Sequence, residues 1–342
     1  MSATRSRVLL AAALAVCLVA ATAWPLARVA QQAPDRRWYK GNTHAHTINS
    51  DGDSTPDDVV RWYREHGYHF VVLSDHNFLT AVEGLNAVFG AVDKFLVIPG
   101  EEVTSRSGDK PIHVNGLAIR EVVPPPQPGT PLEMLQRSID AIRSVDGLPH
   151  VNHPNFGWAV TADDLRQLER TRLFEIFNGH PQVNVLGGGG VPGLEEIWDR
   201  VLSSGRLMFG IAVDDAHYFK QPGNAALPGP GGGWVVVRAD RLETRAVLDA
   251  LERGDFYATT GVDLRDIQAS EREVVVDVHT TTYSKYRVQF IGRDGRLLDE
   301  QTALPARYML RGDEGYVRAK VVESNGRLAW TQPVPVGGFT LR

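Results

Sequence analysis

The chain has 342 residues, 43% of them hydrophobic, which is enough to bury the core of one large domain with a smaller one beside it. Its net charge of −5 and pI of about 6.1 argue against the broadly basic surface typical of proteins that bind long nucleic acids. The single cysteine, Cys17, lies in a segment that export would remove. Disulfide bonds and thiolate catalysis are therefore not expected, and a bound metal ion would be held by nitrogen and oxygen atoms.

The first 23 residues have the form of a signal peptide. Arg5 and Arg7 precede an apolar run over residues 8–20, and Ala21-Thr22-Ala23 has the small-x-small form of a signal-peptidase site. The alternative is an uncleaved membrane anchor, although the run is shorter than the about 20 apolar residues that a span requires. We therefore expect an exported protein, periplasmic or extracellular, that meets a membrane only through an uncleaved N-terminal segment. Residues 24–37 are expected to form a linker.

Strand-like and helix-like patterns alternate over residues 38–263. Thr55 is expected to cap the first helix, with Pro56 at its first position. Further helices are predicted over residues 81–92, 132–145, 162–170, 194–204 and 243–253, and strands over 69–73, 95–98, 112–119, 148–153, 173–177, 207–213 and 234–237. This alternation predicts an α/β fold with a parallel sheet that is closed or nearly closed into a barrel.

The pattern changes near residue 263. Short alternating strands are predicted over residues 273–278, 286–291, 308–310 and 316–322, separated by turn signals such as Ser324-Asn325-Gly326. No helical pattern is evident there. We therefore expect residues 264–342 to form a small all-β, sandwich-like domain, for which the sequence indicates no partner.

Histidines and carboxylates gather at the ends of the predicted strands. His44 and His46 are one residue apart, so on a strand their imidazoles point to the same face. In barrels of this kind the chemistry is placed at the carboxyl ends of the strands. The complete set is His44, His46, Asp51, His76, Glu102, His113, His153, Asp215 and His217. Such ligands suit two or three divalent ions of zinc, manganese or iron, and without metal their burial would carry a large desolvation cost.

Several neighbouring residues have less certain roles in the pattern. A carboxylate that bridges two ions would offset their repulsion, and Glu102 is the candidate, with Glu101 on the opposite face of the strand as the alternative. Asp75 either orients an imidazole or faces solvent. His180, on a loop at the same face, either contacts substrate, acts as a proton donor, or packs its loop. Four histidines lack partners in the pattern and are expected outside the site: His66, His69, His150 and His279.

The ordered motifs resemble those of the polymerase and histidinol phosphatase (PHP) superfamily of metal-dependent phosphoesterases. They are His44-x-His46, Ser50-Asp51-Gly52, Ser74-Asp75-His76, Gly100-x-Glu102, His113, His153-Pro154 and Asp215-x-His217. The resemblance implies a distorted (β/α)7 TIM-like barrel with a trinuclear site. It assigns one ion to His44, His46, Glu102 and Asp215, a second to Glu102, His113 and His153, and a third to Asp51, His76 and His217.

The sequence therefore favours an exported phosphoesterase that hydrolyses a small phosphate mono- or diester through a metal-bridged hydroxide. His180 and Asp215 are the predicted catalytic residues. Two alternatives stay open at this point. One is a metal-dependent hydrolase of a carboxylic ester or amide, and the other is a non-catalytic binding protein of the cell surface.

Overall fold

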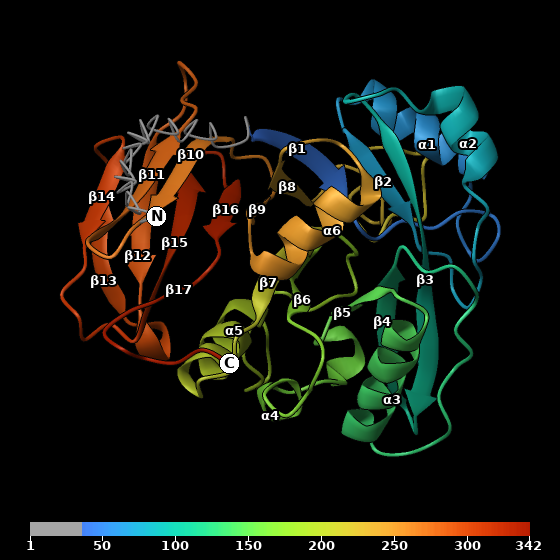
Figure 1. Ribbon diagram of the computed structural model, residues 1–342, viewed down its shortest axis with the longest axis horizontal. Helices are drawn as coiled ribbons and strands as arrows, with labels where there is room; N and C mark the ends of the chain where they lie inside the picture. The colour runs from blue at the N-terminus through green and yellow to red at the C-terminus, as the bar shows by residue number, and fades with distance from the viewer. Residues whose placement is uncertain (1–35) are drawn as a thin grey trace, which may run out of the picture. The chain divides into compact units, whose positions relative to one another are not determined.

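A computed structural model describes residues 36–342 of the chain (Figure 1). The signal peptide predicted for residues 1–23 and all but the last two residues of the predicted linker lie outside the described residues. Within residues 36–342, no helix has both the length and the apolar character needed to cross a membrane.

A large mixed sheet forms the centre of the fold. Its first nine strands are β1 (Arg37–Asn42), β2 (Phe70–Leu73), β3 (Leu96–Ser107), β4 (Lys110–Leu117), β5 (Leu148–Val151), β6 (Leu173–Asn178), β7 (Phe209–Val213), β8 (Trp234–Ala239) and β9 (Phe256–Thr259). The hydrogen-bonded order of these strands is β9-β8-β1-β2-β3-β4-β5-β6-β7. The pairs β1–β2, β2–β3, β5–β6 and β6–β7 are parallel, whereas β4 is antiparallel to both of its neighbours and β8 is antiparallel to β1. The predicted parallel sheet is thus present in these four pairs and is interrupted by antiparallel pairs at β4 and β8.

The two ends of this strand series meet without forming a continuous ladder. In the described residues β7 is an edge of the hydrogen-bonded order. An isolated parallel bridge joins Ala45, just after β1, to Ala216, just after β7. In this bridge the Asp215 N–H donates to the His44 carbonyl (3.1 Å) and the His46 N–H donates to the Ala216 carbonyl (2.9 Å). The predicted (β/α)7 barrel is not confirmed, but the carboxyl ends of β1 and β7 lie against each other.

The helices begin largely where the sequence signals place them. They are α1 (Pro56–Glu65), α2 (Glu83–Phe89), α3 (Pro131–Ser144), α4 (Ala162–Leu165), α5 (Leu194–Ser203) and α6 (Thr244–Arg253), with a 3₁₀ turn η1 at Phe156–Trp158. Thr55 caps α1 as predicted, because its side chain accepts a hydrogen bond from the Asp58 N–H. The buried face of α1 carries Val59, Val60 and Tyr63.

The helix predicted over residues 162–170 is wrong beyond Leu165. Arg166, Gln167 and Leu168 still donate to backbone carbonyls of the preceding turn, whereas the backbone of Glu169 and Arg170 bonds to side chains of α3. Gln136 pairs with both the N–H and the carbonyl of Glu169, and Arg143 donates to the Arg170 carbonyl at 2.8 Å. These long-range bonds satisfy groups that a further helical turn would have used.

Residues 264–342 contain strands and one 3₁₀ turn, η2 (Arg293–Gly295). The strands are β10 (Leu264–Ala269), β11 (Glu273–Val278), β12 (Tyr286–Ile291), β13 (Leu297–Gln301), β14 (Ala306–Met309), β15 (Tyr316–Glu323), β16 (Leu328–Thr331) and β17 (Val334–Pro335). β10, β11 and β14 form a separate three-stranded sheet, whereas β12, β13, β15 and β16 belong to the large sheet. The two sheets contribute to a common buried core that includes Val276, Phe290 and Val321.

The large sheet crosses the predicted domain boundary. β16 pairs antiparallel with β9, and Ala329 lies opposite Thr259. Figure 1 shows the C-terminal strands, coloured orange to red, grouped together beside β9. A separate all-β domain is therefore not confirmed, and the boundary at residue 263 stays a prediction.

A buried ion pair also joins the C-terminal strands to α5. Both carboxylate oxygens of Asp199 accept hydrogen bonds from the Arg318 guanidinium, at 2.8 and 2.7 Å. The Tyr316 hydroxyl donates to the same carboxylate at 2.8 Å, and the guanidinium lies 4.8 Å from the centre of the Trp198 ring. Arg318 is 1% exposed, so its charge depends on this partner.

Candidate metal centre

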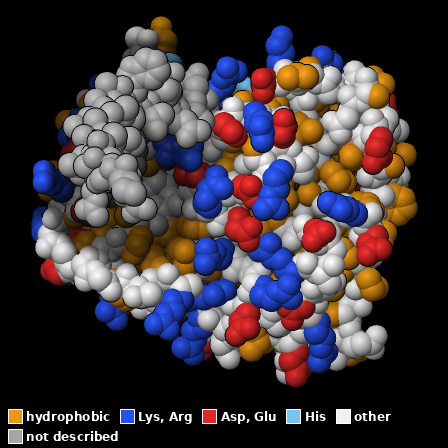
Figure 2. All heavy atoms as spheres, in the orientation of Figure 1, with side chains coloured by type: hydrophobic (Ala, Val, Ile, Leu, Met, Phe, Trp, Pro, Cys, Tyr) orange, Lys and Arg blue, Asp and Glu red, His pale blue; other side chains and the backbone are white. Residues whose placement is uncertain are grey.

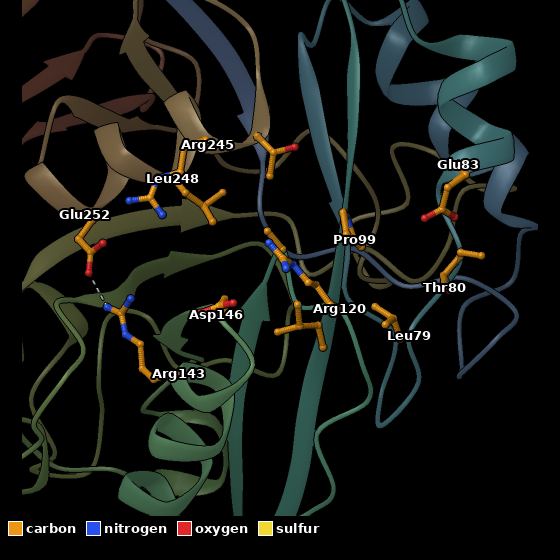
Figure 3. A pocket seen from close by; sticks show the side chains of 15 residues that line it. Leu79, Thr80, Glu83, Pro99, Arg120, Arg143, Asp146, Arg245, Leu248 and Glu252 are labelled. Carbon is orange, nitrogen blue, oxygen red and sulfur yellow. Dashed lines mark hydrogen bonds and ion pairs between the residues drawn. The ribbon is translucent and has the colours of Figure 1, made fainter.

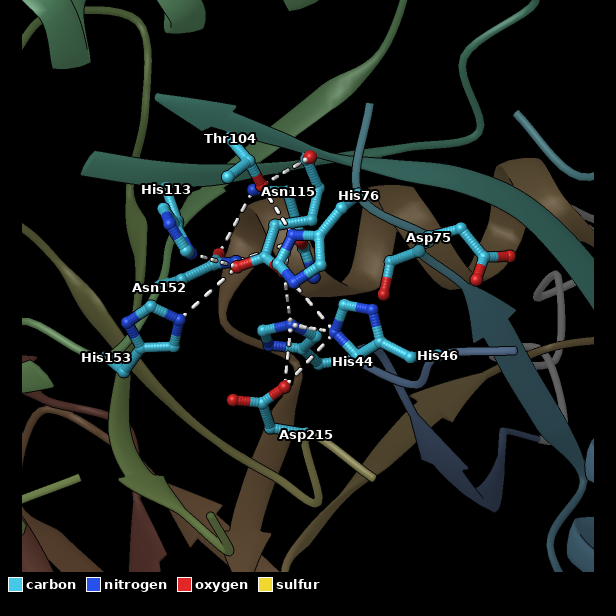
Figure 4. Close-up of polar contacts among 12 residues, drawn as sticks. His44, His46, Asp75, His76, Thr104, His113, Asn115, Asn152, His153 and Asp215 are labelled. Carbon is cyan, nitrogen blue, oxygen red and sulfur yellow. Dashed lines mark hydrogen bonds and ion pairs between the residues drawn. The ribbon is translucent and has the colours of Figure 1, made fainter. Parts of the chain in front are cut away.

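The first predicted group of ligands converges beyond the ends of β1 and β7 and beside the middle of β3 (Figure 4). His44 Nε2 and His46 Nε2 lie 3.1 Å apart, and each lies 3.3 Å from Glu102 Oε2 and 3.2 Å from Asp215 Oδ1. The ligand atoms of His44, His46 and Glu102 all lie within 4.8 Å of one another, and Asp215 lies beside both imidazoles. All four side chains are buried.

The second group surrounds the other oxygen of Glu102. His113 Nδ1 lies 2.8 Å from Glu102 Oε1, and His153 Nε2 lies 3.3 Å from it. The amide of Asn152 donates to the same oxygen at 2.7 Å. The two oxygens of Glu102 therefore face different sets of imidazoles, which is the arrangement expected of a bridging carboxylate.

The third group lies at the mouth of the site. Asp51 Oδ1 is 3.3 Å from His217 Nε2, and Asp51 Oδ2 is 3.5 Å from His76 Nε2. The rings of His46 and His217 stack with their centres 4.1 Å apart, so this group adjoins the first. The structure thus brings all nine residues of the predicted set together in three neighbouring groups.

A buried oxygen that lacks a hydrogen bond indicates whether these residues fit a metal ion. Glu102 Oε2 makes no hydrogen bond of acceptable geometry with any described residue, although three imidazole nitrogens lie within 3.3 Å of it. A buried carboxylate oxygen without a donor is costly, and a cation at this point would remove the cost. The donors are nitrogen and carboxylate oxygen only, a set that suits zinc, manganese and iron.

Without a bound ion, the charged groups of the cluster strongly shift one another's pKa values. Burial raises the pKa of Glu102, but the imidazoles of His76, His44 and His113 outweigh it and lower that pKa well below its usual value. Burial likewise opposes protonation of His76, yet Glu102 and Asp51 raise its pKa to about 10. Protonated imidazoles here supply the positive charge that a metal ion would supply.

A cavity of about 220 Å³ opens onto the cluster, and His180 stands in its wall beside Phe156 and Gln182. His180 Nδ1 accepts a hydrogen bond from the Gln182 N–H at 3.2 Å, so the neutral ring carries its proton on Nε2. Burial lowers the pKa of His180, and His217 and His153 add to the effect against the opposing influence of Asp215. The prediction that His180 lies at the active face agrees with this position.

Glu175 is a residue of the site that sequence reasoning missed. It lies in the middle of β6, and its Oε1 is 2.7 Å from His44 Nδ1. Its Oε2 accepts hydrogen bonds from the His153 N–H (2.7 Å) and from the Asn178 amide (2.8 Å). The available signal was a carboxylate within the apolar run Leu173-Phe174-Glu175-Ile176-Phe177, where a charged side chain needs a partner.

Burial and side-chain direction decide the roles that the sequence left open for Glu101, Asp75 and the four outlying histidines. The Glu101 side chain is buried away from the cluster, where it accepts a hydrogen bond from the Val123 N–H, and burial raises its pKa to about 7. Asp75 is buried and accepts hydrogen bonds from Thr47, Ser50 and Thr80, and the Ser50 hydroxyl lies 3.4 Å from His46 Nδ1, so Asp75 reaches this imidazole through Ser50. Of the four histidines expected outside the site, His66, His69 and His279 have no contact with the predicted ligands among the described residues, whereas His150 Nδ1 lies 3.9 Å from Glu175 Oε1, behind His44.

A larger cavity, of about 1010 Å³, lies elsewhere in the fold, between α3, α6 and the loop before α2 (Figure 3). Its walls carry Arg120, Arg143 and Arg245 together with Glu83, Asp146 and Glu252. The charges of these six residues balance, and Arg143 already pairs with Glu252 at 2.6 Å. No ligand-like cluster lines it in the described part of the chain, so the smaller cavity is the candidate site.

Comparison with known proteins finds similar solved structures but no matching protein family. No protein-family model matches the chain, and no curated protein sequence is similar to it. Among solved structures, a two-domain protein from Bacteroides vulgatus that contains a predicted PHP-like metal-dependent phosphoesterase is 16% identical (TM-score 0.49). That similarity covers 87% of this chain and 96% of the other.

Two further structures resemble parts of the chain. An amidohydrolase from Chromobacterium violaceum, with bound sulfate and no metal, is 14% identical over 53% of this chain and 88% of its own (TM-score 0.36). The lesion-specific endonuclease EndoQ from Pyrococcus furiosus is 12% identical over 64% of this chain and 56% of its own (TM-score 0.40). The activity of this chain is therefore inferred from its own residues.

Proposed function

We propose that this chain is an exported metal-dependent phosphoesterase that hydrolyses a phosphate mono- or diester with two or three divalent ions of zinc, manganese or iron. The observation that carries the proposal is the placement of Glu102, whose two oxygens face different groups of imidazoles while one of them lacks any hydrogen bond. One ion would be held by His44, His46, Glu102 and Asp215, a second by Glu102, His113 and His153, and a third by Asp51, His76 and His217.

The charge of the site supports bound cations. Four carboxylates converge on it, those of Asp51, Glu102, Glu175 and Asp215, and no Lys or Arg is among the described residues that line the cavity. Once the imidazoles are neutral, as metal ligands are, these carboxylates would repel an anionic phosphate ester. Two divalent ions would balance the four carboxylates, and a third would make the site attractive to a phosphate group.

The reaction adds the oxygen of water to phosphorus and breaks the bond to the ester oxygen, which leaves with a proton. Bound divalent ions would supply positive charge for the phosphate oxygens and lower the pKa of the attacking water. With Nδ1 accepting a hydrogen bond from the Gln182 N–H, the neutral ring of His180 would direct its Nε2–H at the departing oxygen as a hydrogen-bond donor, and the proton released by the attacking water would complete the alcohol. Asp215, on the wall of the same cavity, is the second proposed catalytic residue and also a ligand.

The dimensions and charge favour a small phosphorylated substrate over long nucleic acid. The cavity at the cluster holds only about 220 Å³. On the face that Figure 2 shows, Lys and Arg side chains are interspersed with Asp and Glu, so this face lacks the basic stripe typical of nucleic-acid binding.

Replacement of Asp215 tests the proposal. The protein would be loaded with zinc or manganese and assayed against a panel of phosphate monoesters, phosphodiesters, a short oligonucleotide, carboxylic esters and amides. Asp215→Ala should abolish hydrolysis of an aryl phosphate while the far-UV circular dichroism spectrum stays unchanged. His279→Ala, which alters an exposed histidine outside the three groups, is the matched control and should retain full activity.

The same experiment decides between the alternatives. Turnover confined to carboxylic esters or amides would replace the phosphoesterase by the other type of hydrolase. A purified protein that holds no metal by elemental analysis would favour a non-catalytic binding protein. The proposed export is tested separately, by determining the N-terminus of the protein recovered from cell fractions.

A further inference from the structure

One buried amide, that of Asn178, bonds to three residues of the candidate site. Its nitrogen donates to Glu175 Oε2 at 2.8 Å and to Asp215 Oδ2 at 3.1 Å. Its oxygen accepts a hydrogen bond from the His180 N–H at 2.7 Å. Asn178 is 2% exposed, so these contacts are made away from solvent. The function proposed above assigns no role to this residue.

The three partners determine which way the amide points. The ionised carboxylates of Glu175 and Asp215 can only accept hydrogen bonds, and the His180 N–H can only donate one. The nitrogen of Asn178 must therefore face the carboxylates, and its oxygen must face the loop. The bond to the His180 N–H, two residues further along the chain, is a common contact at turns, but a turn does not need the two bonds to carboxylates. This full use of the amide indicates a role beyond ending the strand.

An irregularity of β6 gives Asn178 access to the site. Glu175 and Asn178 are three residues apart, and on a regular strand such residues point to opposite faces. The register of β6 with β7 shifts between Glu175, which lies opposite Ile211, and Phe177, which lies opposite Ala212. The extra residue in β6 lets both side chains reach the same face and bond to each other. Bulges commonly redirect side chains in this way next to functional sites.

The amide leaves one oxygen of Asp215 available to a metal ion. Oδ2 is held by Asn178, whereas Oδ1 lies 3.2 Å from both His44 Nε2 and His46 Nε2. A carboxylate whose second oxygen is bonded elsewhere presents the first oxygen alone to an ion. Hydrogen bonds that orient a ligand in this way affect how tightly the ion is held.

The same amide joins this ligand to the loop that carries His180. His180 and Asp215 both line the metal cavity, on the loops that follow β6 and β7. Asn178 lies opposite Val213 in the parallel pairing of these strands, so the two loops start side by side. Because Asn178 bonds to both loops, it fixes the position of His180 relative to the Asp215 carboxylate. Such positions matter in catalysis, since a displacement of about 1 Å can cost a large part of the rate.

We propose that Asn178 is a positioning residue of the metal centre, which keeps Asp215 a ligand through one oxygen and holds His180 beside it. The effect on metal binding follows from the geometry of the ligands. The effect through His180 rests on the phosphoesterase function proposed above. The two effects can therefore be measured separately, the first of them without any substrate.

Zinc and cobalt binding by the metal-free protein tests the effect on Asp215. In Asn178→Ala the carboxylate is free to rotate or to bind an ion through both oxygens, so zinc affinity should fall about tenfold. Competition with a chromophoric chelator measures this affinity. Cobalt(II) in place of zinc reports the geometry, because its visible absorption is strong with four ligand atoms and weak with five or six. The absorption per bound cobalt ion should therefore fall in the variant.

Asn86→Ala is the matched control. Asn86 lies on α2, and its side chain makes two hydrogen bonds with the backbone of Val97, at 2.8 and 2.9 Å. Its replacement should lower stability but leave zinc affinity and the cobalt spectrum unchanged. If Asn178→Ala does not fold, Asn178→Ser retains a polar group whose single hydrogen cannot bond to both carboxylates. Wild-type zinc affinity and cobalt spectrum in the folded variant, or an equal change in Asn86→Ala, would overturn the proposal.

Turnover tests the effect through His180 and separates it from failure of the proposed function. Asn178→Ala and His180→Ala should each lower kcat for ethyl phosphate at saturating zinc. The double variant should lose less than the product of the two single losses, because both act on one hydrogen-bond donor. Losses that multiply would refute the coupling to His180. A wild type that binds zinc but hydrolyses no phosphate ester would refute the proposed function and this coupling, whereas weaker zinc binding by Asn178→Ala would still uphold the effect on Asp215.

Discussion

Two regions of this protein bury charge almost completely, and they do so in opposite ways. Between α5 and β15, the Arg318 guanidinium and the Asp199 carboxylate balance each other's charge through two hydrogen bonds, and Tyr316 donates a third, although Arg318 Nη1 has no hydrogen bond. Beyond the ends of β1 and β7 and beside the middle of β3, acidic and imidazole groups crowd together, and Glu102 Oε2 has no hydrogen bond. In the first region one cation is paired with one anion, whereas in the second imidazoles have to be protonated to balance the carboxylates, and a bound cation would replace those protons.

The largest effect on stability is expected at the Arg318–Asp199 pair. Arg318→Met should lower the free energy of unfolding by about 3–5 kcal/mol, because it leaves the Asp199 carboxylate buried without its charge partner. Denaturant unfolding monitored by circular dichroism measures this. Adding Asp199→Leu should recover much of the loss, and metal binding by the folded variant should be unchanged. A loss well below 1 kcal/mol would contradict the comparison.

A smaller effect, on metal affinity, is expected from the carboxylate behind His44. Glu175→Gln keeps the shape of the side chain but removes the charge that orients and polarises the imidazole, so affinity for zinc should fall about 10–100-fold. Competition with a chromophoric chelator measures the affinity. Glu271→Gln, at an exposed position, is the control. Unchanged affinity in Glu175→Gln would assign Glu175 to packing alone.

The smallest expected effect is a change of metal affinity with pH. Glu102 and Asp51 outweigh burial and raise the pKa of His76 to about 10, so without metal the ring is protonated below that pH and must lose its proton to bind an ion. Zinc affinity should therefore rise about tenfold per pH unit between pH 6 and 8 for each proton displaced. Calorimetry in buffers of different ionisation enthalpy counts the protons. Metal binding without proton release would contradict the charges described for this cluster.

The nine side chains that the sequence singles out lie close together in the structure, and the signals that identify them are local. His44 and His46 are one residue apart, and each further predicted ligand follows an apolar run that could be recognised as a strand. The choice of Glu102 over Glu101 came from the Gly-x-Glu form of the motif. Strand alternation indicated only that the two side chains point to opposite faces, and the structure places them so.

What escaped prediction depends on pairing between distant segments. Glu175 gains its meaning only from His44, which is 131 residues away in the chain. The early end of α4 is due to side chains of α3, and the antiparallel position of β4 is due to register with β3 and β5. Local patterns carry no information about such partners, which is also why the continuation of the sheet from β9 into β16 was not anticipated.

The pairing of β16 with β9 has a consequence for shortened versions of the chain. β9 is bonded to β8 on one side and to β16 on the other. A protein cut after residue 263 would leave one side of β9 with unpaired N–H and carbonyl groups, and exposed rows of this kind invite association with other chains. The C-terminal strands thus cover this edge of the sheet, and residues 36–263 are best produced together with them.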